Sequence, residues 1–212
     1  MHKLTGLYLV TPDWDDTDKL LHVSEQALQG GAALLQYRHK FADAALRLQQ
    51  AAALQALCRR YQKPFIVNDH LDLCLALDAD GIHVGGTDAG VAQVRAAVGA
   101  DKIVGASCYG DWALALAAQQ AGASYVAFGG FFPSRVKKYP VTTELAILAQ
   151  AKAGLTVPNV VIGGMSVDNC PPLLAAGAHM VAAISSVYLA QDPQAAAQAL
   201  AGLPFTVFQP AA

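Results

Sequence analysis

The sequence has little charge and no long apolar run. Only 14% of its 212 residues are Asp, Glu, Lys or Arg, and the net charge is −2, so no broad basic surface is available to attract nucleic acid. A stretch of about 18 uninterrupted apolar residues, as a membrane-spanning helix needs, is missing. The N-terminus also lacks a signal-peptide core ahead of a cleavable small-residue site. These absences favour a protein that does not bind membranes and that stays in the cytoplasm.

Cysteine is scarce as well. The four cysteines are Cys58, Cys74, Cys108 and Cys170. They show no Cys-x-x-Cys spacing and no His/Cys metal pattern, so a reduced, cytoplasmic chain fits best.

What the chain does have is apolar residues, 54% of the total, in short bursts. This content argues against disorder, and a chain of this length can bury most of its apolar surface without disulfides. The length suits one domain over residues 1–212, at the short end for a barrel of βα units.

Short β-rich bursts alternate with Ala-rich helical stretches along the whole chain. The expected strands are Gly6–Thr11, Leu34–Arg38, Pro64–Asn68, Gly81–Val84, Ile103–Ala106, Tyr125–Phe128, Asn159–Ile162 and Met180–Ile184. The expected helices are Asp18–Gln29, Asp43–Tyr61, Leu71–Ala76, Gly90–Val98, Asp111–Ala121, Thr143–Ala153, Val167–Ala176 and Pro193–Ala201, with Asp111 and Ser166 as N-caps. Eight alternations without a linker predict an α/β fold, a closed (βα)8 TIM barrel, in preference to a doubly wound open sheet, which usually has fewer strands.

Polar residues gather directly after the expected strands, the end of a barrel that carries active sites. They are Gln36, Arg38 and Lys40, Asn68 and Asp69, Gly85 to Asp88, Ser107, Ser134 to Lys138, Gly163-Gly164 and Ser185-Ser186.

This set contains the residue types that bind phosphorylated ligands. Asp69 and Asp88 suit Mg²⁺, which takes one or two carboxylates and leaves its other positions to water and substrate phosphates. Arg and Lys suit the same oxygens, and the turns at Gly163-Gly164 and Ile184-Ser185 match the phosphate-binding loops after the last two barrel strands. Taken singly, the aspartates could be helix N-caps, Arg38 and Lys40 could form salt bridges, and the glycines could form a plain turn.

Other reactive side chains are expected to have packing roles. His83 and His179 lie within or beside strands, where a hydrogen-bonded structural role is favoured. His39 is expected to alternate away from Arg38 and Lys40. Cys108 has no nearby base, which argues against a thiolate nucleophile.

From Leu7 to Ser185, these residues resemble the thiamin phosphate synthase (thiamin-phosphate pyrophosphorylase) family. The shared motifs are Gln-x-Arg-x-Lys after strand two, Asn-Asp after strand three, a Gly-His-x-Gly-x-x-Asp-like segment around strand four, Gly-x-Ser after strand five, a Phe-Pro-Thr-x-Thr-Lys-like loop and an Ile-Gly-Gly turn. Together, in this order, they are far more specific than any one alone.

The resemblance implies a Mg²⁺-dependent transferase that acts on two small phosphorylated heterocycles. It implies that hydroxymethylpyrimidine diphosphate loses pyrophosphate to give a pyrimidine-stabilised cation, which the nitrogen of a thiazole phosphate captures. The resemblance implies that the pyrimidine diphosphate is bound by Gln36, Arg38, Lys40, Asn68, Ser107 and Lys137. It implies that Mg²⁺ is bound by Asp69 and Asp88. It implies that the thiazole phosphate is bound by Ser134, Arg135, Val136, Gly164, Ile184 and Ser185. Arg38, Lys40, Ser107 and Lys137 are the expected catalytic residues.

The chain departs from the family pattern at three positions. Ser134 replaces a threonine, Val136 stands where a second hydroxyl is usual, and Gly86 replaces a common glutamine. The first two changes bear on affinity for the thiazole phosphate, and the third bears on the shape of the pyrimidine-side loop.

Two alternative functions remain open. A thiazole tautomerase on the same barrel should carry a histidine two residues after the Gly-x-Ser serine, where this chain has Tyr109. A phosphate-binding module without turnover would keep the ligand contacts. The sequence also leaves open whether the chain forms a homo-oligomer.

Overall fold

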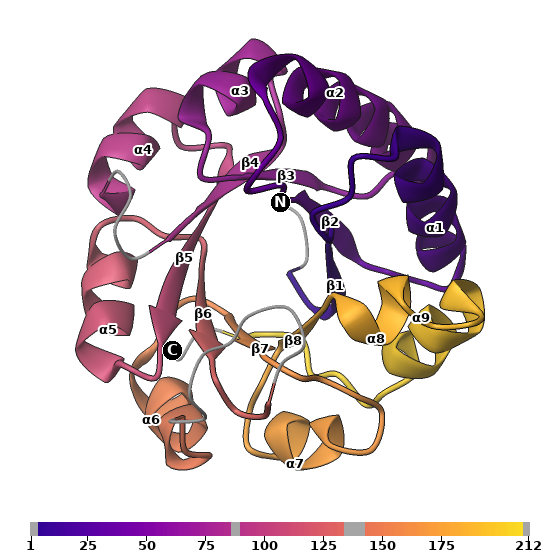
Figure 1. Ribbon diagram of the computed structural model, residues 1–212. Coiled ribbons are helices and arrows are strands. Elements are labelled where there is room, and N and C mark those ends of the chain that lie inside the picture. The colour runs from indigo at the N-terminus through magenta and orange to yellow at the C-terminus, as the bar shows by residue number, and fades with distance from the viewer. Residues whose placement is uncertain (1–3, 86–89, 134–142, 210–212) are drawn as a thin grey trace.

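The computed structural model describes residues 4–85, 90–133 and 143–209. In these residues eight parallel strands close into a barrel in sequence order, with helices around it (Figure 1). The strands are β1 (Gly6–Val10), β2 (Leu34–Tyr37), β3 (Phe65–Asn68), β4 (Gly81–Val84), β5 (Ile103–Tyr109), β6 (Tyr125–Gly129), β7 (Asn159–Ile162) and β8 (Met180–Ala183). The predicted TIM barrel is confirmed.

The helices follow the strands in the expected alternation. They are α1 (Thr17–Gln29), α2 (Ala44–Arg60), α3 (Leu71–Ala76), α4 (Val91–Val98), α5 (Trp112–Gln120), α6 (Ala146–Gly154), α7 (Cys170–Ala175), α8 (Ser185–Tyr188) and α9 (Pro193–Ala201). Asp16, Asp43, Asp111 and Asp192 begin α1, α2, α5 and α9, and each side chain accepts a backbone N–H of the first turn. None of the helices in the described ranges is both long enough and apolar enough to cross a bilayer.

Several element boundaries differ from the prediction, and two helix starts differ for a clear physical reason. The Ser166 N-cap is wrong: α7 begins at Cys170, because Pro171 and Pro172 have no N–H to bond the carbonyls of residues 167 and 168. α6 begins at Ala146 rather than Thr143, because the hydroxyl of Thr143 donates to the carbonyl of Gly129 and holds this residue against β6. The short helix α8 directly after β8 was not predicted.

The apolar residues form two cores separated by the sheet. The larger core lies between the strands and the surrounding helices. The smaller one fills the barrel, with Tyr8, Leu34, Ile66, Tyr125 and Met180 among its buried members. The interior of the barrel is therefore packed, and in barrels of this kind active sites lie at the mouth formed by the carboxyl ends of the strands.

Candidate active site

Two predicted site residues at the end of β2 are buried, and the third reaches the surface. Gln36 is 4% exposed within the strand and Arg38 is 8% exposed just after it. The Nη1 of Arg38 donates to both carboxylate oxygens of Asp13, at 3.1 and 3.0 Å. The backbone N–H of Lys40 donates to the same carboxylate at 2.7 Å. Asp13, in the loop after β1, therefore fixes the segment that carries both cations.

The guanidinium of Arg38 retains unused hydrogen-bonding capacity. Its Nε is buried and, within the described part of the chain, has no hydrogen-bond partner. A buried charged donor without a partner is costly. The Nε of Arg47 is in the same state, so the missing partner by itself does not mark a ligand site.

Asp69 lies at the end of β3 in a backbone conformation that is uncommon for a residue with a side chain, with φ of 63°. Its Oδ1 accepts the backbone N–H of Gly85 at 3.1 Å, and its Oδ2 accepts Nδ2 of Asn68 at 2.6 Å. The Nζ of Lys40 lies 3.5 Å from Oδ2. The N-cap of α3 is His70, so Asp69 is not the helix cap that was one reading of the sequence; its carboxylate connects β2, β3 and β4 at the mouth.

Ser107 projects from β5 and contacts His83 of β4. The Oγ of Ser107 lies 2.9 Å from Nε2 of His83, and Nδ1 of His83 lies 2.9 Å from the hydroxyl of Tyr125. The hydrogen-bonded role expected for His83 is confirmed, but its direct contact with a predicted catalytic residue was not foreseen. The Nε2 of His39 lies 3.0 Å from Oδ1 of Asp15, and its Nδ1 accepts the backbone N–H of Ala42 at 3.0 Å.

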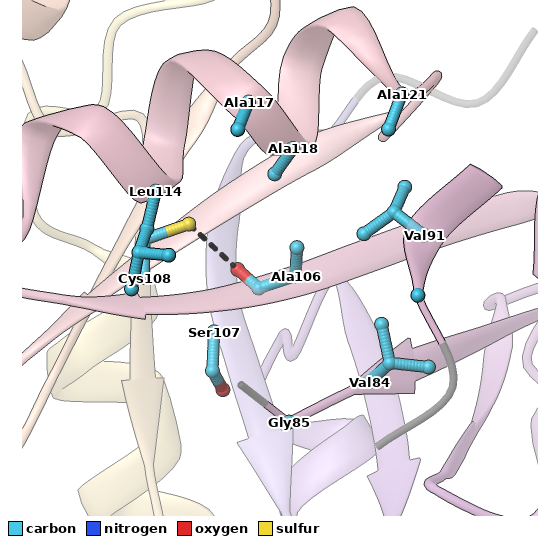
Figure 2. Close-up of a pocket in the computed structure, with 11 residues that line it drawn as sticks. Val84, Gly85, Val91, Ala106, Ser107, Cys108, Leu114, Ala117, Ala118 and Ala121 are labelled. Atoms are coloured by element: carbon cyan, nitrogen blue, oxygen red, sulfur yellow. Dashed lines mark hydrogen bonds between the residues drawn. The ribbon is translucent and has the colours of Figure 1, made fainter. Parts of the chain in front are cut away.

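A cavity of about 220 Å³ lies on the outer side of β5, between the sheet and helices α4 and α5. Val84, Val91, Leu114 and Ala118 contribute apolar walls, and Figure 2 shows Ser107 directed away from the alanines of α5. Cys108 faces this cavity, and burial raises the pKa of its thiol to about 12. The thiol is therefore protonated at neutral pH, in agreement with the prediction that it is not a nucleophile.

The opposite side of the mouth is formed by the ends of β7 and β8. Gly163 and Gly164 have positive φ values of 114° and 64°, and a Cβ on Gly164 would lie 2.3 Å from the carbonyl oxygen of Pro133. Glycine is therefore required for this turn. Ile184 is the N-cap of α8 and Ser185 is its first residue.

Five predicted site residues lie outside the described ranges: Asp88, Ser134, Arg135, Val136 and Lys137. The nine others all lie at or next to the carboxyl ends of their strands: Gln36, Arg38, Lys40, Asn68, Asp69, Ser107, Gly164, Ile184 and Ser185. The residues that the prediction missed are Asp13, Tyr8, Tyr125 and the site contact of His83. Asp13 follows β1 and could have been found by the same rule that identified the others.

The similarities to known proteins extend over almost the whole chain. A family model described as thiamine monophosphate synthase matches residues 7–187. The chain is 70% identical over 200 residues to the thiamine-phosphate synthase of Janthinobacterium sp. (strain Marseille), covering 94% of this chain and 97% of that protein. The chain belongs to the thiamine monophosphate synthase family. The family predicted from the motifs is thus confirmed.

Less similar proteins support the same family assignment. The thiamine-phosphate synthase of Aromatoleum aromaticum is 49% identical over 197 residues, covering 93% of this chain and 95% of that protein. The solved structure titled thiamine phosphate pyrophosphorylase from Pyrococcus furiosus superposes with a TM-score of 0.81 at 32% identity, covering 94% of each chain. The family resemblance therefore applies to the complete barrel as well as to its motifs.

Proposed function

We propose that this protein condenses hydroxymethylpyrimidine diphosphate with hydroxyethylthiazole phosphate to give thiamin phosphate and pyrophosphate. Membership of the family supports this reaction. The local observation that carries it is the pair of cations at the mouth, Arg38 and Lys40, which are both held by Asp13 and favour an anionic ligand there.

The described residues also fit a Mg²⁺ ion held mainly by substrate. No group of three or more His, Cys, Asp or Glu side chains that could bind a metal occurs in the described ranges. Mg²⁺ does not require such a group, since one or two carboxylates suffice when phosphates and waters complete its octahedron. Asp69 supplies one carboxylate at the mouth, and Asp88 is the proposed second ligand. When bound, Mg²⁺ would neutralise charge on the departing pyrophosphate.

The chain's own residues would contribute charge and orientation. Arg38 and Lys40 would bind the diphosphate, with Asp13 holding both in place. Asn68 would fix the carboxylate of Asp69, and Lys137 would add a further cation. Donors that are already oriented stabilise the charge of a leaving group without reorganising during the reaction.

The substitution itself needs no protein nucleophile. Loss of pyrophosphate breaks the C–O bond to the pyrimidine methylene, and the thiazole nitrogen forms the new C–N bond to the resulting cation. The protonated thiol of Cys108 is consistent with this route. Holding the two rings in attack geometry would provide much of the rate enhancement.

The second phosphate would bind at the ends of β7 and β8. Gly164, Ile184 and Ser185 are the proposed residues on the described side, where the glycine turn and the first turn of α8 present backbone N–H groups. Ser134, Arg135 and Val136 are the proposed residues from the loop after β6.

One incubation tests the proposal. The protein, both heterocycles and Mg²⁺ should yield thiamin phosphate and pyrophosphate, and EDTA should abolish the product. A phosphate-binding module would bind the ligands but release no pyrophosphate, and a tautomerase would isomerise a thiazole without any pyrimidine substrate. Full turnover in EDTA would contradict the metal assignment alone.

A matched pair of lysine variants tests the loop after β6. Lys137→Ala is expected to abolish turnover, because Lys137 aligns with the family lysine, whereas Lys138→Ala should retain it. Equal losses in the two variants would contradict the assignment of Lys137.

A further inference from the structure

A continuous chain of hydrogen bonds crosses the interior of the barrel from Gln36 to Ser107. The Nε2 of Gln36 donates to the hydroxyl of Tyr8 at 2.7 Å. The hydroxyls of Tyr8 and Tyr125 are 2.6 Å apart, and that of Tyr125 lies 2.9 Å from Nδ1 of His83. The last link joins Nε2 of His83 to Ser107 at 2.9 Å. Both ends of the chain are residues proposed to bind the pyrimidine diphosphate.

The packing of the barrel interior holds the rings of this hydrogen-bond chain in place. A Cβ on Gly105 would lie 2.0 Å from Cζ and 2.2 Å from the hydroxyl oxygen of Tyr125, so the absence of a side chain on β5 gives the phenol its position. The rings of His83 and Tyr125 are stacked at 20° with centroids 5.6 Å apart. The Tyr8 ring meets Tyr125 edge-on at 5.8 Å. Each ring is therefore held by packing as well as by its hydrogen bonds.

The amide of Gln36 favours one direction for this series of hydrogen bonds. An amide nitrogen can only donate, so Gln36 makes the Tyr8 oxygen an acceptor and leaves the Tyr8 proton for Tyr125. Tyr125 then donates to Nδ1 of His83. A neutral imidazole that accepts at Nδ1 carries its proton on Nε2 and donates it to Ser107. The Ser107 oxygen thus accepts from His83, and its own proton is left to donate elsewhere.

The opposite direction is disfavoured by crowding around the Tyr8 hydroxyl. If Ser107 donated to His83, Tyr125 would donate to Tyr8, and the Tyr8 proton would compete with Gln36 for the same narrow space. Neighbouring bonds that point the same way polarise and strengthen one another.

We propose that Tyr8, Tyr125 and His83 are positioning residues that hold His83 as the Nε2-protonated neutral tautomer and orient the Ser107 hydroxyl as a donor to the departing diphosphate. This inference rests on the proposed function for the identity of the acceptor. The orientation of the Ser107 hydroxyl is set by the hydrogen bonds within the protein and is present without substrate. No covalent step is involved, and no proton leaves the chain during turnover.

Nuclear magnetic resonance of the ¹⁵N-labelled histidines tests the orientation directly. The ring nitrogens of His83, assigned with the His83→Gln variant, should show Nε2 protonated and Nδ1 unprotonated in the wild-type protein at neutral pH. Tyr125→Phe removes the donor to Nδ1 and should populate the Nδ1-protonated tautomer. A wild-type imidazolium, or a proton on Nδ1, would overturn the proposal. Because this measurement needs no substrate, it remains decisive even if the proposed reaction is wrong.

Kinetics test the consequence for Ser107. Tyr125→Phe should lower kcat about three- to tenfold, the effect of losing one neutral hydrogen bond, with an unchanged KM for the thiazole phosphate. Tyr188→Phe is the matched control: this buried hydroxyl bonds Ser24 at 2.8 Å, outside the chain. It should cost similar stability and leave kcat unchanged. Equal kcat losses in the two variants would show that the hydrogen-bond chain has only a structural role.

A pair of His83 variants separates the donor from the ring. His83→Gln places an amide N–H near the position of Nε2 and should retain a donor to Ser107. His83→Leu fills similar space without a donor and should lose roughly tenfold more kcat. Identical kcat values for the two variants would overturn the proposal, because they would show that the donor to Ser107 does not matter.

Discussion

At the scale of single residues, the mouth of the barrel consists of charged groups held by partners. Arg38 is oriented by Asp13, and Asp69 is oriented by Asn68 and the backbone of Gly85. Asp69 also adopts a left-handed conformation at the end of its strand. Backbone strain of this kind is retained where the surrounding structure enforces it, and it often marks a functional position.

Exchanging Asp69 should affect activity far more than stability. Asp69→Asn keeps the shape and the tolerance for positive φ but loses the negative charge proposed to bind Mg²⁺. Activity should fall on the order of a hundredfold, while the free energy of unfolding in urea changes by less than about 1 kcal/mol. Asp69→Ala should lose the same activity and a further ~1–2 kcal/mol of stability, because alanine is strained at this φ. Full activity of Asp69→Asn would contradict its role.

Removing Asp13 should disturb both stability and binding. Asp13→Ala leaves the buried guanidinium of Arg38 without its carboxylate, and we expect the free energy of unfolding to fall by about 2 kcal/mol. The KM for the pyrimidine diphosphate should rise, because Arg38 and Lys40 lose their shared anchor. Urea unfolding and steady-state kinetics measure the two effects. Asp101→Ala, an exposed aspartate, is the control and should change neither quantity.

At the scale of elements, the barrel interior depends on matching large and small residues on neighbouring strands. β5 pairs with β6 through Gly105 and Tyr125, and the glycine leaves the space that the tyrosine ring occupies. On the outside, α1 approaches α9 at Gly30, where a Cβ would lie 2.5 Å from the carbonyl oxygen of Gln194. These contacts explain two glycines that interrupt otherwise regular patterns.

Gly105→Ala should therefore destabilise the barrel. The added methyl group would overlap the Tyr125 ring, and overpacking of this kind costs about 1–3 kcal/mol. Thermal and urea unfolding measure the loss. Gly90→Ala is the control, since nothing lies within 4 Å of a Cβ at that position. In the double variant Gly105→Ala/Tyr125→Leu the shorter side chain should relieve the overlap, and an additive loss would show that Tyr125 is not the cause.

At the scale of the whole molecule, closure of the barrel brings the first and last strands together. β1 pairs with β8 from Gly6 opposite Met180 to Leu9 opposite Ala183. His179 lies at this closure: its carbonyl accepts the N–H of Gly6 at 3.1 Å, its Nδ1 accepts the N–H of Asn159 at 3.3 Å, and its ring packs edge-on against Phe208 at 5.1 Å. Its predicted packing role is confirmed.

The closure should weaken in mild acid because of His179. Burial lowers the pKa of this histidine below its ordinary value of 6.5. Just below pH 6.5 the unfolded chain therefore binds a proton at His179 that the folded chain does not bind. Its contribution to stability should be complete above pH 6.5 and decline as the pH falls towards the folded pKa. Urea unfolding between about pH 7.5 and 5.5 measures the slope. His179→Gln should flatten the slope, and an unaltered slope in this variant would contradict the assignment.

The sequence by itself determined the order of the elements and the end of the barrel that carries the site. The pattern of apolar residues and the local composition are properties of short segments. Short apolar strands between Ala-rich helices could therefore be recognised one at a time. Polar residues after each strand could be recognised in the same way, and for this reason Gln36, Arg38, Lys40, Asn68, Asp69 and Ser107 were all placed at the mouth. The start of α7 could also have been read locally, since it depends on the missing N–H groups of Pro171 and Pro172.

Only the tertiary structure decided which of these residues touch. Asp13 and Arg38 are 25 positions apart in sequence, and Tyr8 and Tyr125 are 117 apart. The hydrogen bond within each pair exists only because barrel closure sets the register of neighbouring strands and points alternate side chains inward. The pattern that marks Tyr8, His83 and Tyr125 as buried strand residues is the same pattern that marks ordinary core residues. Their connection into one directed chain depends on geometry that no local stretch of sequence contains.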